Sequence, residues 1–199
     1  MDLDLSNRRP AHLCVDMQRM FAERTDWHTP WMAKVIPVVT EIARTHSAET
    51  IFTRFIPPER PEHAPGAWRT YFERWRSFTR SEIDLELLDL VEPLRELTPP
   101  ASLCDKPALS AFERTDLQDF LDRRKVDTLV ITGAETDVCV LATVVSAVDR
   151  GFLVVLPKDA LCSSTDETHD ALITLYGKRF AAQVVLTDAE QLLRAWPMV

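Results

Sequence analysis

Cys139 has the sequence surroundings of a reactive thiol. It follows Thr136, Asp137 and Val138 and lies in the first turn of a predicted helix, which Thr136 is expected to cap. Unpaired backbone N–H groups and the helix dipole favour a thiolate at such a position, so we expect a lowered pKa for Cys139. The same N–H groups can stabilise an oxyanion on a carbonyl that the sulfur attacks. The alternative is a cysteine that only packs against a sheet, as free cysteines often do.

Two charged residues complete a candidate catalytic group with Cys139. The chain has no histidine at a predicted strand end, so Asp16 is the available proton acceptor for the thiol. Lys106 follows another predicted strand and can balance the charges of the group. Taken alone, these two residues have simpler interpretations, a strand-end carboxylate and a surface lysine. Their expected convergence at one edge of a sheet favours a nucleophilic hydrolase.

The elements expected to position these residues alternate between strand and helix. Short apolar runs typical of strands buried on both faces cover residues 12–16, 50–56, 102–105, 127–132, 152–156 and 183–186. Helical patterns cover residues 31–46, 84–97, 115–124, 136–150 (closed by Gly151) and 164–176 (closed by Gly177). This order predicts an α/β fold with three αβα layers around a doubly wound, mainly parallel sheet of about six strands. Ligands of such sheets bind at the carboxyl ends of the strands.

Composition restricts the classes of function. The 199 residues, 46% hydrophobic and 27% charged, fit a single domain over residues 1–199. The chain has only four glycines, which excludes glycine-rich phosphate-binding loops, and its formal net charge of −8 argues against nucleic acid as a partner. We find neither a membrane-spanning stretch nor an export signal, and expect a cytoplasmic protein without membrane contact. The four cysteines are therefore expected to be free thiols, with no zinc site among them.

Three segments give the chain a resemblance to a known family. They are Val15-Asp16-Met17-Gln18, Asp105-Lys106-Pro107 followed by Ser110-Ala111-Phe112, and the run from Thr132 to Val140. In these motifs the chain resembles the isochorismatase-like cysteine hydrolases, which include nicotinamidases and N-carbamoylsarcosine amidases. The resemblance implies the isochorismatase-like hydrolase fold, with Asp16, Lys106 and Cys139 as a catalytic triad. It also implies a cis peptide between Ala134 and Glu135, which helps to aim N–H groups into an oxyanion hole formed by Ala134, Glu135, Val138 and Cys139.

The chain departs from the nicotinamidase pattern after the second predicted strand. Nicotinamidases carry an Asp-x-His motif and a further histidine, which bind a divalent metal. Here the segment reads Phe52-Thr53-Arg54-Phe55-Ile56-Pro57-Pro58, with His63 alone downstream. These residues do not supply a metal site, so the resemblance implies a metal-free member without a cofactor, acting on a substrate other than nicotinamide.

Residues close to the motifs are candidates for the walls of the substrate pocket. Gln18, Phe21 and Phe112 flank the triad segments. Arg54, near the sheet edge, could pair with a carboxylate or carbonyl of a substrate, or instead form a salt bridge with an acidic neighbour.

An aromatic helix is predicted after the second strand. Its apolar face carries Trp68, Tyr71, Phe72, Trp75 and Phe78. This face is expected to pack on the sheet or at a subunit interface, while Trp68 and Tyr71 are further candidates for the pocket. An aromatic patch of this size predicts a homo-oligomer, either a dimer or a tetramer.

The sequence thus predicts a cysteine hydrolase for a small-molecule substrate. The predicted reaction cleaves a C–N bond of an amide, carbamoyl or ureido group through a thioester on Cys139. One alternative is an isochorismatase-type hydrolysis of a vinyl ether, with Asp16 as the acid and Cys139 less essential. The other is a non-catalytic binding or interaction protein on the same scaffold, against which the three filled triad positions argue.

Overall fold

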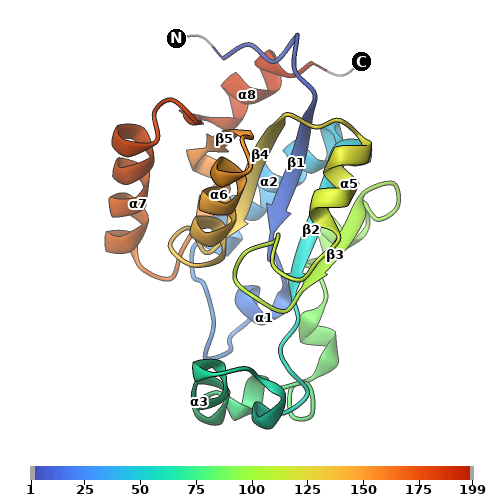
Figure 1. Ribbon diagram of the computed structural model, residues 1–199. Coiled ribbons are helices and arrows are strands. Elements are labelled where there is room, and N and C mark those ends of the chain that lie inside the picture. The colour runs from blue at the N-terminus through green and yellow to red at the C-terminus, as the bar shows by residue number, and fades with distance from the viewer. Residues whose placement is uncertain (1–2, 198–199) are drawn as a thin grey trace.

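A computed structural model describes residues 3–197 of the chain (Figure 1). Its strands form one sheet in the order β3-β2-β1-β4-β5-β7, with β6 paired to β4, and every strand pairing is parallel. The strands are β1 (Pro10–Val15), β2 (Thr50–Phe55), β3 (Ser102–Lys106), β4 (Thr128–Ala134), β5 (Leu153–Pro157), β6 (Leu161–Cys162) and β7 (Val184–Thr187). The predicted α/β fold with a parallel sheet is therefore confirmed. β6 was not predicted because its two residues are too few to give a pattern.

Helices cover both faces of this sheet, as the predicted three layers require (Figure 1). In the described residues they are α1 (Arg19–Ala22), α2 (Met32–Thr45), α3 (Ala67–Arg74), α4 (Glu92–Arg95), α5 (Leu117–Arg123), α6 (Cys139–Asp149), α7 (Asp166–Arg179) and α8 (Ala189–Ala195). Helices α2, α4 and α8 share one hydrophobic core with the sheet, and α5, α6 and α7 share another on the opposite face.

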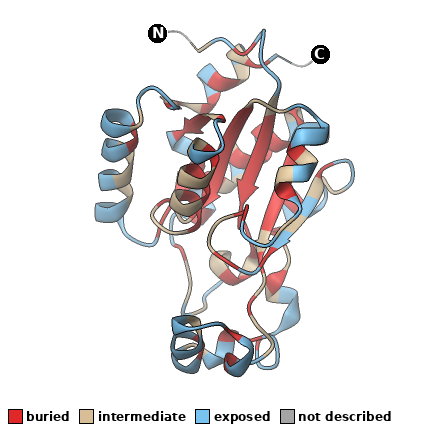
Figure 2. Cartoon of the chain, viewed as in Figure 1, coloured by how far each residue is buried: buried red, intermediate tan, exposed pale blue. Residues whose placement is uncertain are grey.

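Successive residues of the central strands supply these two cores in turn. Leu13 on β1 and Ile131 on β4 belong to the core beneath α6, whereas Cys14 and Val130 belong to the core beneath α2. Side chains of a strand alternate between its faces, so a strand covered on both sides needs an unbroken apolar run. Figure 2 shows the result, with a buried sheet and exposed outer faces on the helices.

Three local expectations were wrong. Residues 84–97 do not form one helix, because an extended stretch after the 3-10 helix Leu85–Leu88 carries Leu90 into a bridge with Gln18 before α4 begins. Gly177 does not end α7 but lies inside it, where a Cβ would stand 3.2 Å from Leu186 Cδ1 of β7. Finally, β3 is not buried on both faces, since it lies at the edge of the sheet and leaves the Leu103 side chain exposed.

Residues 57–88 form an outlying part of the fold, here called the aromatic module, which includes α3 and lies beyond the carboxyl ends of the strands (Figure 1). Phe72 and Phe78 of the module are buried in a small separate core. Trp27, from the loop after α1, enters this core and stacks on Phe78 with ring centroids 3.9 Å apart. The predicted aromatic face is thus largely covered within the chain, and the homo-oligomer stays a prediction.

No helix in residues 3–197 is both long enough and apolar enough to cross a membrane.

Candidate active site

The parallel sheet brings Asp16 and Lys106 together although 90 residues of sequence separate them. Asp16 directly follows β1, and Lys106 is the last residue of β3, on the other side of β2. Lys106 Nζ lies 2.7 Å from Asp16 Oδ2, and the two side chains are 0% and 1% exposed. A buried ion pair of this kind costs desolvation free energy, which close contact and further hydrogen bonds must offset.

Hydrogen bonds hold both members of the ion pair. The Thr53 hydroxyl of β2 donates to Asp16 Oδ1 at 2.6 Å and accepts from the Asp16 backbone N–H at 3.1 Å. Lys106 Nζ donates to the Ala108 carbonyl at 2.9 Å. Burial by itself lowers the pKa of Lys106, but the neighbouring Asp16 and Cys139 outweigh it, so the net pKa is raised. Lys106 is therefore a charged partner that fixes one oxygen of Asp16.

Cys139, the first residue of α6, lies close enough to Asp16 and Lys106 for both to affect the pKa of its thiol. Burial raises the pKa of its thiol; Lys106 opposes this shift and Asp16 adds to it. The sequence-based expectation of a lowered pKa was thus wrong, because removal from water outweighs the helix start. Burial therefore favours the neutral form of the Cys139 thiol, which lies next to the ion pair of Asp16 and Lys106.

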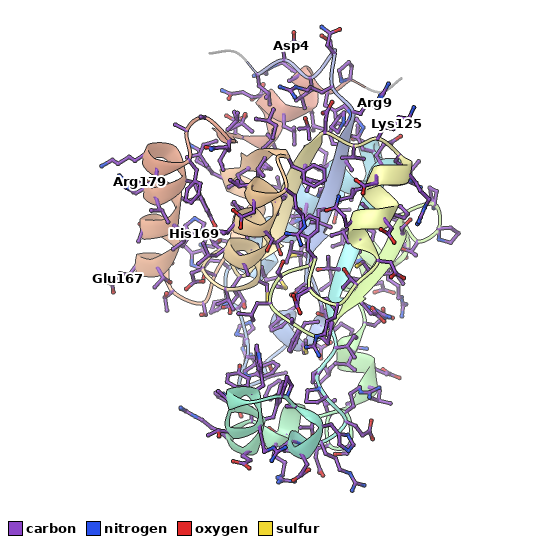
Figure 3. All side chains as sticks on the ribbon, in the orientation of Figure 1. Asp4, Arg9, Lys125, Glu167, His169 and Arg179 are labelled. Carbon is purple, nitrogen blue, oxygen red and sulfur yellow. The ribbon has the colours of Figure 1, made fainter. Side chains whose placement is uncertain are left out.

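The turn before α6 is held by contacts other than the predicted cap. Val138 occupies the N-cap position and no side chain caps the helix there. The Thr136 hydroxyl instead donates to the Cys162 carbonyl at 3.1 Å and lies 2.9 Å from Nδ1 of His169. His169, labelled in Figure 3, belongs to α7. The turn that presents Cys139 is therefore tied to β6 and to α7.

Two backbone N–H groups beside the thiol are free to bind an oxyanion. The Ala134–Glu135 peptide is cis, and the Glu135 carbonyl accepts from the N–H groups of Val138 at 3.1 Å and Val140 at 3.0 Å. Over residues 3–197, the N–H groups of Glu135 and Cys139 have no backbone or side-chain acceptor. Val138, a predicted oxyanion donor, is thus engaged within the turn, and Ala134 contributes the preceding half of the cis peptide.

A cavity of about 180 Å³ lies between the carboxyl ends of the strands and the aromatic module. The Cys139 side chain is only 7% exposed, and the residue lines the cavity. Its walls are Phe21, Asp26, Trp27, His28, Phe55, Trp68, Tyr71, Leu109, Ala134, Glu135, Val138, Cys139 and Ser164. The size and the apolar walls suit a small organic molecule that reaches the sulfur.

Residues 10–190 match the Isochorismatase domain. The chain belongs to the isochorismatase family. Nicotinamidase 3 of Arabidopsis thaliana is 28% identical over 193 residues, which cover 96% of this chain and 91% of that protein. A 57-residue segment is 39% identical to N-carbamoylsarcosine amidase of Arthrobacter sp, covering 29% of this chain and 22% of that one. A cysteine hydrolase from Pseudomonas syringae pv. phaseolicola 1448A shares the fold, with a TM-score of 0.81 at 22% identity over 94% of this chain and 92% of the other.

In this isochorismatase-family protein, three of the predicted pocket residues line the cavity, namely Phe21, Trp68 and Tyr71. Arg54 does not line it; its guanidinium binds both oxygens of Asp105 at 2.7 and 2.9 Å and contacts Asp89. On β2 it is Phe55, next to Arg54 and on the other face, that reaches the cavity. Arg54 thus forms the salt bridge that was its alternative interpretation.

Gln18 and Phe112 were also wrong as pocket walls. The Gln18 side chain is fully buried, donating to the carbonyls of Phe55 and Leu88 at 3.1 and 2.7 Å and accepting from the Phe55 N–H at 2.7 Å. It fastens the end of the aromatic module to β2. Phe112 stacks on Phe152 in the core beneath α6, with ring centroids 6.1 Å apart.

The sequence reasoning missed several walls of the cavity, namely Asp26, Trp27, His28, Phe55, Leu109 and Ser164. Phe55 could have been found, because it ends β2 at the same edge of the sheet as Asp16. The loop carrying Asp26, Trp27 and His28 gives no such signal. Its place depends on Trp27 packing into the core of the aromatic module.

The residues of this family member do not fit the divalent metal of nicotinamidases. In β2, the Thr53 hydroxyl donates a hydrogen bond to Asp16, and the Arg54 guanidinium is paired with Asp105. His63 does not line the cavity that contains Cys139. Within residues 3–197, no three His, Cys, Asp or Glu side chains gather in a way that could hold a metal ion.

Proposed function

We propose that this protein hydrolyses a C–N bond of a small amide, carbamoyl or ureido compound through a thioester on Cys139. The observation that carries the proposal is the buried ion pair of Asp16 and Lys106, 2.7 Å apart, beside the thiol of Cys139 at the cavity. An ion pair removed from water is costly to keep, and here it lies next to a nucleophile and two free N–H groups. Relatives named nicotinamidase, N-carbamoylsarcosine amidase and maleamate amidohydrolase support a C–N bond as the target.

The first half of the reaction forms the thioester. As Cys139 Sγ attacks the carbonyl carbon, its proton moves to Asp16, a carboxylate close enough to affect the pKa of the thiol. The carbonyl oxygen becomes an oxyanion, which we assign to the N–H groups of Glu135 and Cys139, because neither has a backbone acceptor in the described residues. Asp16 then gives its proton to the leaving nitrogen, the C–N bond breaks, and ammonia or an amine departs. Lys106 keeps the site near electrical balance during both transfers.

The second half restores the enzyme. Water enters the place of the departed amine, and Asp16 removes a proton from it while its oxygen attacks the thioester carbon. The same N–H groups of Glu135 and Cys139 stabilise the second oxyanion. Collapse of this intermediate breaks the C–S bond, Asp16 returns the proton to sulfur, and the acid product leaves. The raised pKa of the Cys139 thiol opposes loss of its proton in the first half and favours return of the proton to sulfur in the second. Asp16 must therefore take the proton as the C–S bond forms.

The proposal is tested with Cys139→Ala and a matched variant, Cys104→Ala, which removes a half-buried thiol from β3. A panel of small amides, carbamoyl and ureido compounds is scored by ammonia release. We expect Cys139→Ala to lower kcat/KM by at least about 10⁴-fold, as loss of a catalytic nucleophile does elsewhere. Cys104→Ala should remain active and should still be labelled by iodoacetamide at residue 139, as read by mass spectrometry of the digested protein.

Each other outcome has a defined meaning. If Cys139→Ala keeps its activity, the thioester mechanism is wrong, and vinyl-ether hydrolysis with Asp16 as the acid gains support. If folded wild-type protein releases no product from any compound of the panel but binds some of them, the protein is a binding module.

A further inference from the structure

The charged walls of the cavity have one sign. Asp26 and Glu135 both line it, and neither forms a salt bridge with any residue in the described part of the chain. The one titratable base among the lining residues is His28. Two cations near the cavity are already paired, Lys106 with Asp16 and Arg54 with Asp105. Arg74 is near enough to Tyr71 to oppose the rise in its pKa, but it does not line the cavity. No fixed cation among the lining residues therefore faces a carboxylate on a substrate.

Aromatic rings form the remaining part of the same walls. Trp27 has its ring centroid 6.1 Å from that of Phe21, 6.3 Å from Phe55 and 6.2 Å from Tyr71. Trp68 meets Tyr71 edge-to-face at 5.2 Å. The faces of such rings attract cations, and rings grouped around a site are a known means of holding an ammonium group. Rings and carboxylates thus favour the same kind of ligand.

We propose that the substrate is a small amide whose non-reacting end carries a positive charge, held by Asp26, Glu135 and the aromatic walls. The proposal rests on the amide hydrolysis argued above and specifies its substrate class. It disfavours ureido acids, other carboxylate-bearing amides and vinyl-ether acids, because their anion would meet two carboxylates and no lysine or arginine in the cavity wall.

Glu135 is suited to this role because part of its carboxylate is already fixed. Its Oε1 accepts from the Ser164 backbone N–H at 2.9 Å and lies 3.4 Å from the Thr29 hydroxyl. These contacts leave Oε2 for a ligand. A glutamine at this position can keep an acceptor for Ser164 and removes only the charge. Asp26 is an exposed residue, so Asp26→Asn likewise changes charge without opening a core.

The test uses three probes of nearly equal shape, 3-(aminomethyl)benzamide, 3-(hydroxymethyl)benzamide and 3-carbamoylbenzoate. Their dissociation constants are measured by calorimetry on Cys139→Ala, which removes turnover from the binding measurement. We expect the cation to bind at least about tenfold more tightly than the anion, with the neutral probe between them. Adding Asp26→Asn and Glu135→Gln to Cys139→Ala should reduce that ratio to less than about threefold. Adding Asp119→Asn instead, a carboxylate on α5 away from the cavity, should leave the ratio unchanged.

The result that overturns the proposal is an anion that binds as well as the cation, or a preference that survives removal of both carboxylates. Hydrolysis of the same probes by the wild-type protein separates this failure from that of the proposed function. Turnover without a charge preference leaves amide hydrolysis standing and removes the cationic substrate. A charge preference in binding without turnover of any amide does the reverse.

Discussion

The carboxyl ends of the strands and the aromatic module face the same cavity, yet they are built in different ways. Asp16 follows the central strand β1, Cys139 begins α6, and Lys106 ends the edge strand β3; they are 1%, 7% and 0% exposed. The module has its own small core, and its residues Tyr71 and Leu85 are 41% and 61% exposed. Charges that react must be dry and fixed, which a sheet covered on both faces provides. Recognition of a substrate needs only side chains that line the cavity. A small module attached to the sheet can carry such side chains, and its sequence can change without disturbing the main core.

The comparison predicts that removing a single charge at the carboxyl ends of the strands lowers stability and hydrolysis far more than any change in the module. Lys106→Met leaves Asp16 buried without its partner, so we expect a loss of about 3–5 kcal/mol in unfolding free energy and no measurable hydrolysis. The double variant Asp16→Asn/Lys106→Met removes both charges and should regain most of the stability while staying inactive. Urea unfolding and ammonia release measure the two quantities. A stable, inactive Lys106→Met would show that the pair is not energetically coupled.

A glycine in each region can be replaced by alanine to compare the sheet with the aromatic module. A Cβ on Gly133 of β4 would stand 2.1 Å from the Val15 carbonyl oxygen, and the residue has φ of +105°. Gly66, before α3, has φ of +52° and nothing within 4 Å of a Cβ. We expect Gly133→Ala to cost more than about 4 kcal/mol and to displace Asp16, which follows Val15. Gly66→Ala should cost about 1–3 kcal/mol from backbone strain alone. Equal losses in thermal or urea unfolding would contradict the difference between the regions.

A histidine in each region gives a smaller, pH-dependent contrast. Burial, with a contribution from His46, lowers the pKa of His12 on β1 from 6.5 to about 3. The unfolded chain therefore binds a proton below pH 6.5 that the folded chain refuses, and stability falls as pH falls from 6.5 towards 3. Between pH 7 and pH 5 this costs about 2 kcal/mol.

His12→Gln should lose about that much less than the wild type over the same interval, since glutamine does not titrate. His63→Gln in the module, where the histidine is exposed, should follow the wild type. Urea unfolding at the two pH values provides the measurement. An unchanged pH dependence in His12→Gln would mean that other groups cause the loss.

Most strands of the sheet were predictable because burial on both faces requires their residues to be apolar. A strand such as β4 must be apolar throughout when both of its faces are covered, so sequence and burial coincide. β3 shows the limit, since at the sheet edge a short run includes the exposed Leu103. The break between residues 84 and 97 was missed because leucines at helical spacing fit two short turns as well as one helix.

The convergence of Asp16, Lys106 and Cys139 could be predicted from their places at strand ends and at a helix start, but most walls of the cavity could not. Gln18 directly follows the triad segment, yet its amide turns to the backbone of Phe55 and Leu88. For Arg54 the sequence left a substrate contact and a salt bridge open, and the structure shows the salt bridge with Asp105, because neighbouring residues of a strand point to opposite faces. Asp26 and His28 reach the cavity only because Trp27 packs into the aromatic module, a contact between distant segments that no local pattern encodes.

Lys106 is carried by β3, which has a neighbour on one side only. Edge strands open at lower free energy than central ones, so the lysine can leave the site while β1 and α6 keep Asp16 and Cys139 in place. The bidentate contact of Arg54 with Asp105 joins β2 to β3 one residue before Lys106, and it therefore stabilises the paired state of β3. In mild denaturant the protein would accordingly become inactive before it unfolds, with amide exchange in β3 preceding exchange in the rest of the sheet.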